Sequence, residues 1–183
     1  MKKLISAALA ALLLLSLCAC SGNKPQPPVE KDSYNVLLDA SLKLVTDFDR
    51  ETLDKVLYRS QIEYMIQDYA SKDKDYIAAL EEEFASVAAA YTEAYGEDWK
   101  LSYTINETIE KDAEGIEKYK EFDSFYFKTY GIDTDKIQAV TFLKVTAHIA
   151  GSLGSNSKDR TIQCFMIDGA WYSFYAIRLG LKL

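Results

Sequence analysis

The stretch Ile137–Leu179, which reads IQAVTFLKVTAHIAGSLGSNSKDRTIQCFMIDGAWYSFYAIRL, decides the fold class. Apolar or small residues occupy its odd-numbered positions from 137 to 149, with the two-residue period of a half-buried strand. Short segments of Gly, Ser, Asn and Asp separate this strand from two further apolar segments, as in an antiparallel meander. The stretch therefore predicts strands at 137–149, 161–167 and 170–179, with turns at 151–157 and 168–169.

The sequence before this meander predicts several helices and then one further strand. The clearest helix covers 75–96, where apolar residues recur at steps of three and four between Asp75 and Gly96. Shorter helices are expected within 33–69. Residues 99–106 alternate as a strand does, and a helical insert is expected at 115–130. Helices followed by an antiparallel meander give the α+β class.

The order of these elements over residues 34–179 resembles the NTF2-like fold, as does the hairpin sequence IDGAWY at Ile167–Tyr172. Small, uncharacterised lipoproteins of Gram-positive bacteria are similar in both features. The resemblance implies a cone in which N-terminal helices pack on a curved antiparallel sheet of about four strands. It implies little about function, because this fold carries both enzymes and binding or assembly modules.

Such a cone implies a cavity between the sheet and the helices, with apolar walls and few polar groups. The chain contains 13 Tyr, 8 Phe and 2 Trp. Tyrosine and tryptophan need a hydrogen-bond partner when buried, which favours partly hydrated walls. Alternatively, the same residues simply fill the core, the commoner outcome at two-residue spacing. The residues expected to line the cavity are Tyr103, Ile105, Leu143, Val145, Trp171 and Tyr175.

Residues 1–19 predict a signal peptide. Two lysines precede the apolar run 4–17, which is shorter than the about 20 residues that a membrane-spanning helix needs. The sequence Leu17-Cys18-Ala19-Cys20 then resembles the lipobox of bacterial lipoproteins. The resemblance implies cleavage before Cys20 and lipidation of Cys20, with anchoring on the extracytoplasmic face of the cell membrane. The alternatives are a plain signal peptide or an uncleaved anchor.

Residues 20–33 contain all three prolines of the chain and predict an extended tether of about 30–40 Å, at about 3.1 Å per residue. One domain, residues 34–183, is expected to follow it. Cleavage would remove two lysines and no acidic residue, which changes the net charge from −7 to −9. An acidic body is repelled by anionic lipid, so the acyl chains are the expected attachment to the membrane.

Composition argues against several function classes. The chain has 28 acidic against 21 basic residues and no basic cluster, so no nucleic-acid partner is expected. His148 is the only histidine and Cys164 the only cysteine after position 20, which predicts neither a Cys/His metal site nor an intramolecular disulfide. We expect no cofactor. No catalytic set is visible, since His148 is expected outside the cavity and Asp168 is explained by its turn; Asp123 is the remaining acid–base candidate.

These patterns predict a membrane-anchored lipoprotein with a non-catalytic binding domain. Its partner would be a small apolar ligand in the cone or a protein met across the open sheet face, and a homodimer through that face is a further expectation. The alternative is an NTF2-like enzyme of the isomerase or dehydratase type, acting on a small apolar substrate. A cavity carboxylate or imidazole with a strongly shifted pKa would favour that alternative.

Overall fold

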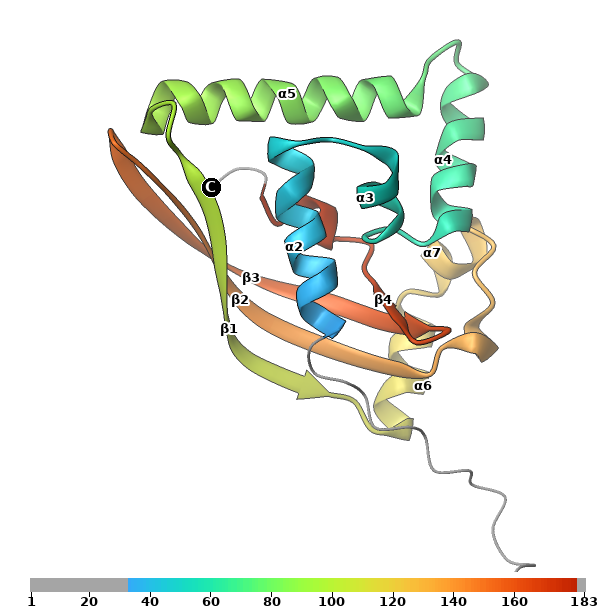
Figure 1. The fold of residues 1–183 in the computed structure, drawn as a ribbon. Helices are drawn as coiled ribbons and strands as arrows, with labels where there is room; N and C mark the ends of the chain where they lie inside the picture. The colour runs from blue at the N-terminus through green and yellow to red at the C-terminus, as the bar shows by residue number, and fades with distance from the viewer. Residues whose placement is uncertain (1–32, 181–183) are drawn as a thin grey trace, which may run out of the picture.

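A computed structural model describes residues 33–180 and has α+β architecture, as the sequence predicted (Figure 1). The expected signal peptide, Cys20 and nearly all of the tether lie outside the described residues. The elements in chain order are α2 (Ser33–Thr46), α3 (Arg50–Asp54), α4 (Arg59–Ala70), α5 (Tyr76–Tyr95), β1 (Lys100–Glu110), α6 (Ala113–Phe122), α7 (Ser124–Thr129), η1 (Thr134–Lys136), β2 (Ala139–Gly151), β3 (Gly154–Ile167), β4 (Ala170–Tyr172) and η2 (Ala176–Arg178).

The four strands form one open antiparallel sheet in the order β1-β2-β3-β4. The sheet curves around α2, and α5 runs across the far side of α2 (Figure 1). On β2, residues from Leu143 to Ile149 alternate between buried and more exposed side chains, and the odd-numbered ones are buried. The two-residue period of the sequence therefore predicted the inward face of β2 correctly.

A first hydrophobic core lies between this inward face and the N-terminal helices. Burying large apolar side chains here stabilises the fold by about 1.5–3 kcal/mol for each side chain. Tyr34 at the start of α2 packs against Trp171 of β4, with ring centroids 4.6 Å apart, and its hydroxyl shares a hydrogen bond of 3.0 Å with Thr141 of β2. The largest members of the first core include Leu37, Leu38, Leu44, Leu53, Leu57, Ile62, Phe84, Leu143 and Ile149.

A second hydrophobic core lies on the opposite face of the sheet, where α6 and α7 cover one end of β2 and β3. Phe127 of α7 contacts Tyr119, Phe165 and Phe174 with ring centroids 5.2–5.7 Å apart. At this end the sheet is buried on both faces. The second core consists of Tyr119, Phe127, Ile132, Ile137, Val140, Phe165, Ile167 and Phe174.

Two predicted boundaries in the meander are wrong. Segment 151–157 is not a turn: β2 and β3 pair as far as Gly151 and Gly154, and only two residues connect them. The polar residues after Gly154 face solvent at the exposed end of the sheet, which is why they resemble a loop. The last strand ends at Tyr172 instead of Leu179. There the Ser173 amide donates to the Val56 carbonyl, and the Ser173 hydroxyl accepts from the backbone amides of the next turn, which begins η2.

The helical insert is also divided in two. Asp123 separates α6 from α7, and Gly131, at φ +64°, follows them as predicted. Strand β1 extends to Glu110, beyond the predicted end, and carries a bulge at Asn106 that shifts its register with β2.

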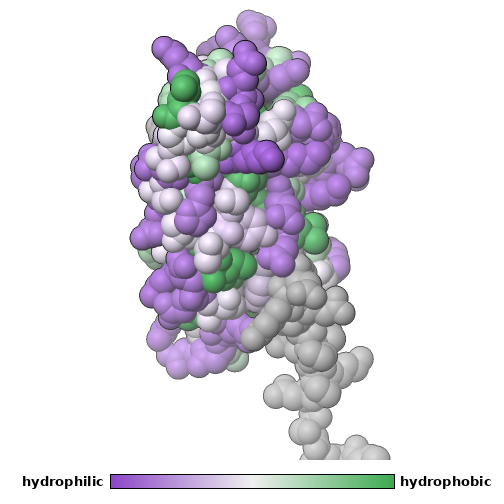
Figure 2. Space-filling view, turned by 60° about the vertical axis from the view of Figure 1, so that its left-hand side comes forward, coloured by the Kyte–Doolittle hydropathy of each residue, from purple (hydrophilic) through white to green (hydrophobic). Residues whose placement is uncertain are grey.

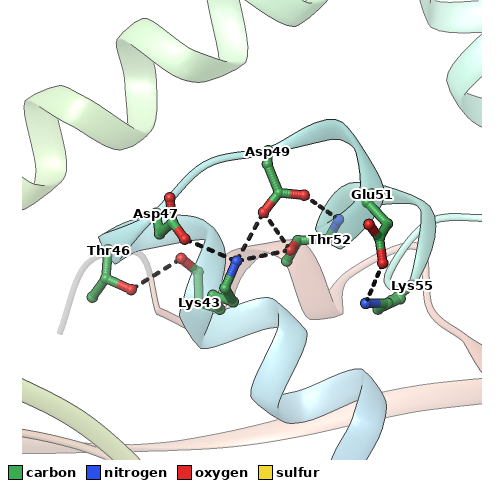
Figure 3. Close-up of polar contacts among 7 residues, drawn as sticks. All are labelled: Lys43, Thr46, Asp47, Asp49, Glu51, Thr52 and Lys55. Carbon is green, nitrogen blue, oxygen red and sulfur yellow. Dashed lines mark hydrogen bonds and ion pairs between the residues drawn. The ribbon is translucent and has the colours of Figure 1, made fainter.

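Lys43 of α2 holds the corner between α2 and α3 (Figure 3). Its ammonium lies 2.9 Å from the carboxylate of Asp47 and 2.8 Å from that of Asp49. Asp49 also caps α3 by accepting hydrogen bonds from the backbone amide and the hydroxyl of Thr52, both at 2.7 Å. The bond from Lys43 and those from Thr52 hold the pKa of Asp49 well below its usual value.

The rest of the outward sheet face is polar. His148 lies between Thr104 of β1 and Ser157 of β3, with its ring nitrogens 3.3 and 2.8 Å from their hydroxyls. Next to it, Thr146 accepts a hydrogen bond from Asn106 and donates one to Asp159, both at 2.7 Å. Figure 2, which brings β1 and the tip of the β2–β3 hairpin forward, shows a mainly hydrophilic surface with isolated hydrophobic groups.

Candidate functional site

A hollow of about 230 Å³ lies between α4, α5, the residue after α7 and the segment from β4 to η2. We call it the tyrosine pocket. Helical spacing explains its walls, because positions four apart share a helix face: Gln61, Met65 and Tyr69 on α4 face Tyr76, Leu80 and Phe84 on α5. The remaining lining residues are Leu57, Glu83, Tyr130, Phe174, Ile177 and Arg178.

Three tyrosines give the pocket its polar character. The rings of Tyr69 and Tyr76 meet edge to face at 5.1 Å, and Tyr130 packs on Phe174 at 5.7 Å. None of the three hydroxyls makes a hydrogen bond with the described residues. Burial, and then the nearby Tyr69 hydroxyl, raise the pKa of Tyr76 to about 12. At neutral pH the Tyr76 hydroxyl is therefore neutral and can donate or accept a hydrogen bond.

Gln61 is the most unusual residue of the pocket. Its side chain is 6% exposed, and its Oε1 is sealed from solvent without a hydrogen-bond partner among the described residues. A buried amide oxygen in this state costs about 1–3 kcal/mol. A half-turn of the amide group exchanges its oxygen and nitrogen, so Gln61 can offer either an acceptor or a donor to a molecule in the pocket.

A second hollow of about 420 Å³ adjoins the tyrosine pocket. We call it the arginine hollow, because Arg160 of β3 and Arg178 of η2 both line it. The two hollows share Glu83 and Arg178, which therefore stand at the boundary between them. The other residues of the arginine hollow are Thr161, Ile162, Tyr175 and Leu179.

The six residues predicted to line one cavity are divided among several places, and none of the four hollows described here contains more than one of them. Leu143 and Val145 are buried in the first core, and Ile105 is half-buried against it. Tyr103 lines an open hollow of about 490 Å³ between α2 and β1. Trp171 lines one of about 240 Å³ beside α2 and α3, and Tyr175 lines the arginine hollow.

The acid–base candidates lie outside the tyrosine pocket. His148 is on the outward sheet face, as expected, and Asp168 has φ +53° in the β3–β4 turn, as expected. Asp123 is 1% exposed at the edge of the second core, and burial raises its pKa. Its Oδ2 has no hydrogen-bond partner in the described chain, and it lines none of the four hollows described above.

The sequence did not indicate the residues that build the tyrosine pocket. A glutamine on a helix is normally solvent-exposed. No sequence pattern distinguishes the buried Gln61 from Gln67, which is exposed on another face of the same helix. The tyrosines of α4 and α5 did show helical spacing, but that spacing predicts burial and not a hollow.

Residues 33–180 contain neither a cluster of metal-binding side chains nor a membrane-spanning helix. No group of three or more Asp, Glu, His or Cys side chains there is arranged to hold a metal ion. Among the same residues, no helix combines the length and apolar character needed to cross a membrane. Comparison of the chain with protein-family models, with curated proteins and with solved structures found no match.

Proposed function

We propose that this protein is a lipid-anchored, extracytoplasmic binding protein whose tyrosine pocket holds a small ligand and performs no chemistry on it. The N-terminal sequence supports the anchor, through the lipobox-like segment at Leu17–Cys20. The order of helices and strands supports an NTF2-like cone as the finer description of the domain. A ligand in the tyrosine pocket would lie between the N-terminal helices and the last part of the chain.

The unpartnered amide oxygen of Gln61 carries this proposal. Buried polar groups in folded proteins nearly always have a hydrogen-bond partner, and those without one need an explanation. Gln61 lines the same hollow as Tyr69, Tyr76 and Tyr130, whose hydroxyls make no hydrogen bond with the described residues. A small molecule with polar groups would satisfy Gln61 and the tyrosines together, while the aromatic and aliphatic walls would bury its apolar part.

The enzymatic alternative, an isomerase or dehydratase, requires a proton-transfer group beside the substrate. Asp123 has the raised pKa of such a group but lies at the edge of the second core. Glu83 is the carboxylate that lines the tyrosine pocket, and it is exposed at the pocket boundary. The binding role therefore has better support than the enzymatic one.

The anchor is tested by the variant Cys20→Ala. Cells producing the chain are grown with a labelled fatty acid, and the label is followed in the purified protein. We expect the label in the parent chain and none in Cys20→Ala, which should accumulate as precursor. A Cys18→Ala variant is the matched control and should keep the label. Labelling of Cys20→Ala would contradict the anchor.

The pocket is tested by native mass spectrometry of the full chain, purified gently in mild detergent. We expect a reproducible additional mass on the monomer. The variant Gln61→Met keeps the side-chain length but removes the amide, and should lose that mass. Gln67→Met, on the exposed side of the same helix, should keep it. An unliganded homodimer, or a mass retained in Gln61→Met, would contradict a ligand in this pocket and favour a protein partner.

A further inference from the structure

Glu83 and Arg178 are the two residues common to the tyrosine pocket and the arginine hollow. They carry opposite charges, both are exposed, and neither forms an ion pair within the described chain. Arg178 belongs to η2, whose start is fixed by the hydroxyl of Ser173, and Glu83 belongs to the long helix α5. Both charges therefore stand on defined backbone at the boundary of the two hollows.

The two hollows differ in charge, because Arg160 gives the arginine hollow a second cation that the tyrosine pocket lacks. Glu83 and Arg178 stand at the boundary of both hollows, and the tyrosine pocket adds only aromatic rings and neutral polar groups, which favour a cation beside the Glu83 carboxylate. The arginine hollow presents the guanidinium groups of Arg160 and Arg178, whose N–H groups match the geometry of a carboxylate. Thr161 and Tyr175 are further polar residues in the lining of the same hollow.

We infer that the two hollows together bind one small zwitterion, with its ammonium group in the tyrosine pocket and its carboxylate in the arginine hollow. In the tyrosine pocket, the ammonium donates hydrogen bonds to Glu83 and to the carbonyl oxygen of Gln61 after the half-turn of its amide. In the arginine hollow, the carboxylate accepts from Arg178 and Arg160. This inference rests on the proposed function, because it names the ligand class of the same site.

The test uses isothermal titration calorimetry on the full chain with ω-amino acids of increasing length, from glycine to aminohexanoate. Each is compared with the alkylamine and the alkanoate of the same carbon count, which carry only one of its two charges. We expect one chain length to bind about tenfold or more tighter than both of its single-charge counterparts. The best length then reports the separation of the two charge sites.

Two charge-removing variants assign the ends. Glu83→Gln should weaken binding of the amino acid and of the alkylamine about tenfold and leave binding of the alkanoate unchanged. Arg178→Gln should weaken binding of the amino acid and of the alkanoate about tenfold and leave binding of the alkylamine unchanged. Their controls are Glu82→Gln, one position away on α5, and Arg59→Gln, whose exposed side chain pairs with Glu63 outside both hollows. Neither control should change the binding of any probe.

Several results would overturn the inference. If the alkylamine or the alkanoate binds as tightly as every amino acid does, the site recognises a ligand with a single charge and not a zwitterion. A copurified molecule in the tyrosine pocket, found together with a protein that binds none of the probes, would refute the zwitterion inference and leave the proposed function intact. If the protein carries no copurified molecule and binds no probe, both the zwitterion inference and the proposed function are refuted.

Discussion

The tyrosine pocket and the second core have similar walls but differ in how closely they are filled. Both are aromatic, and a buried oxygen without a hydrogen-bond partner lies beside each, Gln61 Oε1 in the pocket and Asp123 Oδ2 at the edge of the second core. Beside Gln61 lies a hollow of about 230 Å³. Asp123 lies at the edge of packed rings and lines none of the hollows described above.

The difference shows what an unpartnered buried group means in each place. Beside a hollow, a ligand would supply a hydrogen bond once the Gln61 amide turns toward it, and binding would then offset the cost of Gln61 to stability. In a filled core nothing can enter, so the burial of Asp123 lowers the stability of the fold, an effect that the neighbouring Tyr119 hydroxyl opposes. Substitutions in the tyrosine pocket should therefore change ligand binding, whereas substitutions in the second core should change the free energy of unfolding.

The largest effect is expected in the second core. Phe127→Ala should lower the free energy of unfolding by about 3–5 kcal/mol, because it removes a ring packed against three others and leaves a cavity. Urea unfolding followed by circular dichroism measures this. Phe125→Ala is the control, since Phe125 is 71% exposed on the same helix and its loss should cost less than about 0.5 kcal/mol. If Phe127→Ala and Phe125→Ala lower the free energy of unfolding equally, the second core is not filled.

Asp123→Asn should raise the free energy of unfolding at neutral pH by about 1–2 kcal/mol. Burial raises the pKa of Asp123 above the unfolded value of 3.8. Between these two values the folded chain holds a proton that the unfolded chain has released, so parent stability falls as pH rises through this window. The gain from Asn should therefore be present at neutral pH and disappear below about pH 4. Thermal unfolding across pH tests this, and a gain independent of pH would contradict it.

Two tyrosines provide a smaller contrast. Tyr34→Phe should cost about 0.5–1.5 kcal/mol, because the hydroxyl of Tyr34 shares a buried hydrogen bond with Thr141. Tyr76→Phe should leave the free energy of unfolding of the ligand-free chain nearly unchanged, because the Tyr76 hydroxyl has no partner in the described chain. Parallel urea titrations measure both. A loss for Tyr76→Phe as large as that for Tyr34→Phe would mean that its hydroxyl is bonded within the fold.

The smallest effect on stability is expected for Gln61→Met. Replacing an unpartnered amide by an apolar side chain of similar shape should leave the free energy of unfolding within about 0.5 kcal/mol of the ligand-free parent, or raise it. Thermal unfolding after removal of any bound molecule by dialysis measures this. A loss above about 1 kcal/mol would show that Gln61 supports the fold and not a ligand.

The sequence predicted the parts of the fold that depend on local periodicity. The alternation on β2 and the three- and four-residue spacing of α5 depend on one buried face, and both were recognised. The end of β4 depends on a contact between Ser173 and Val56, far apart in the chain, so no local pattern could predict it. The polar start of β3 resembled a turn because exposed strand ends and loops have the same composition.

The candidate site was less predictable than the fold. The expected cavity used residues of the sheet, because alternation identifies a strand face, and most of these side chains fill the first core. The tyrosine pocket instead combines α4, α5, Tyr130 and η2. Its position depends on how helices pack, and Gln61 becomes notable only when its missing partner is known.

The most direct test of this account is a crystal structure of the full chain, purified from cells and crystallised without added ligand. We expect electron density for a small molecule in the tyrosine pocket, within hydrogen-bond distance of the Gln61 amide and of at least one tyrosine hydroxyl. A pocket closed by its own side chains, with the Gln61 amide bonded to another residue of the chain, would contradict the central claim.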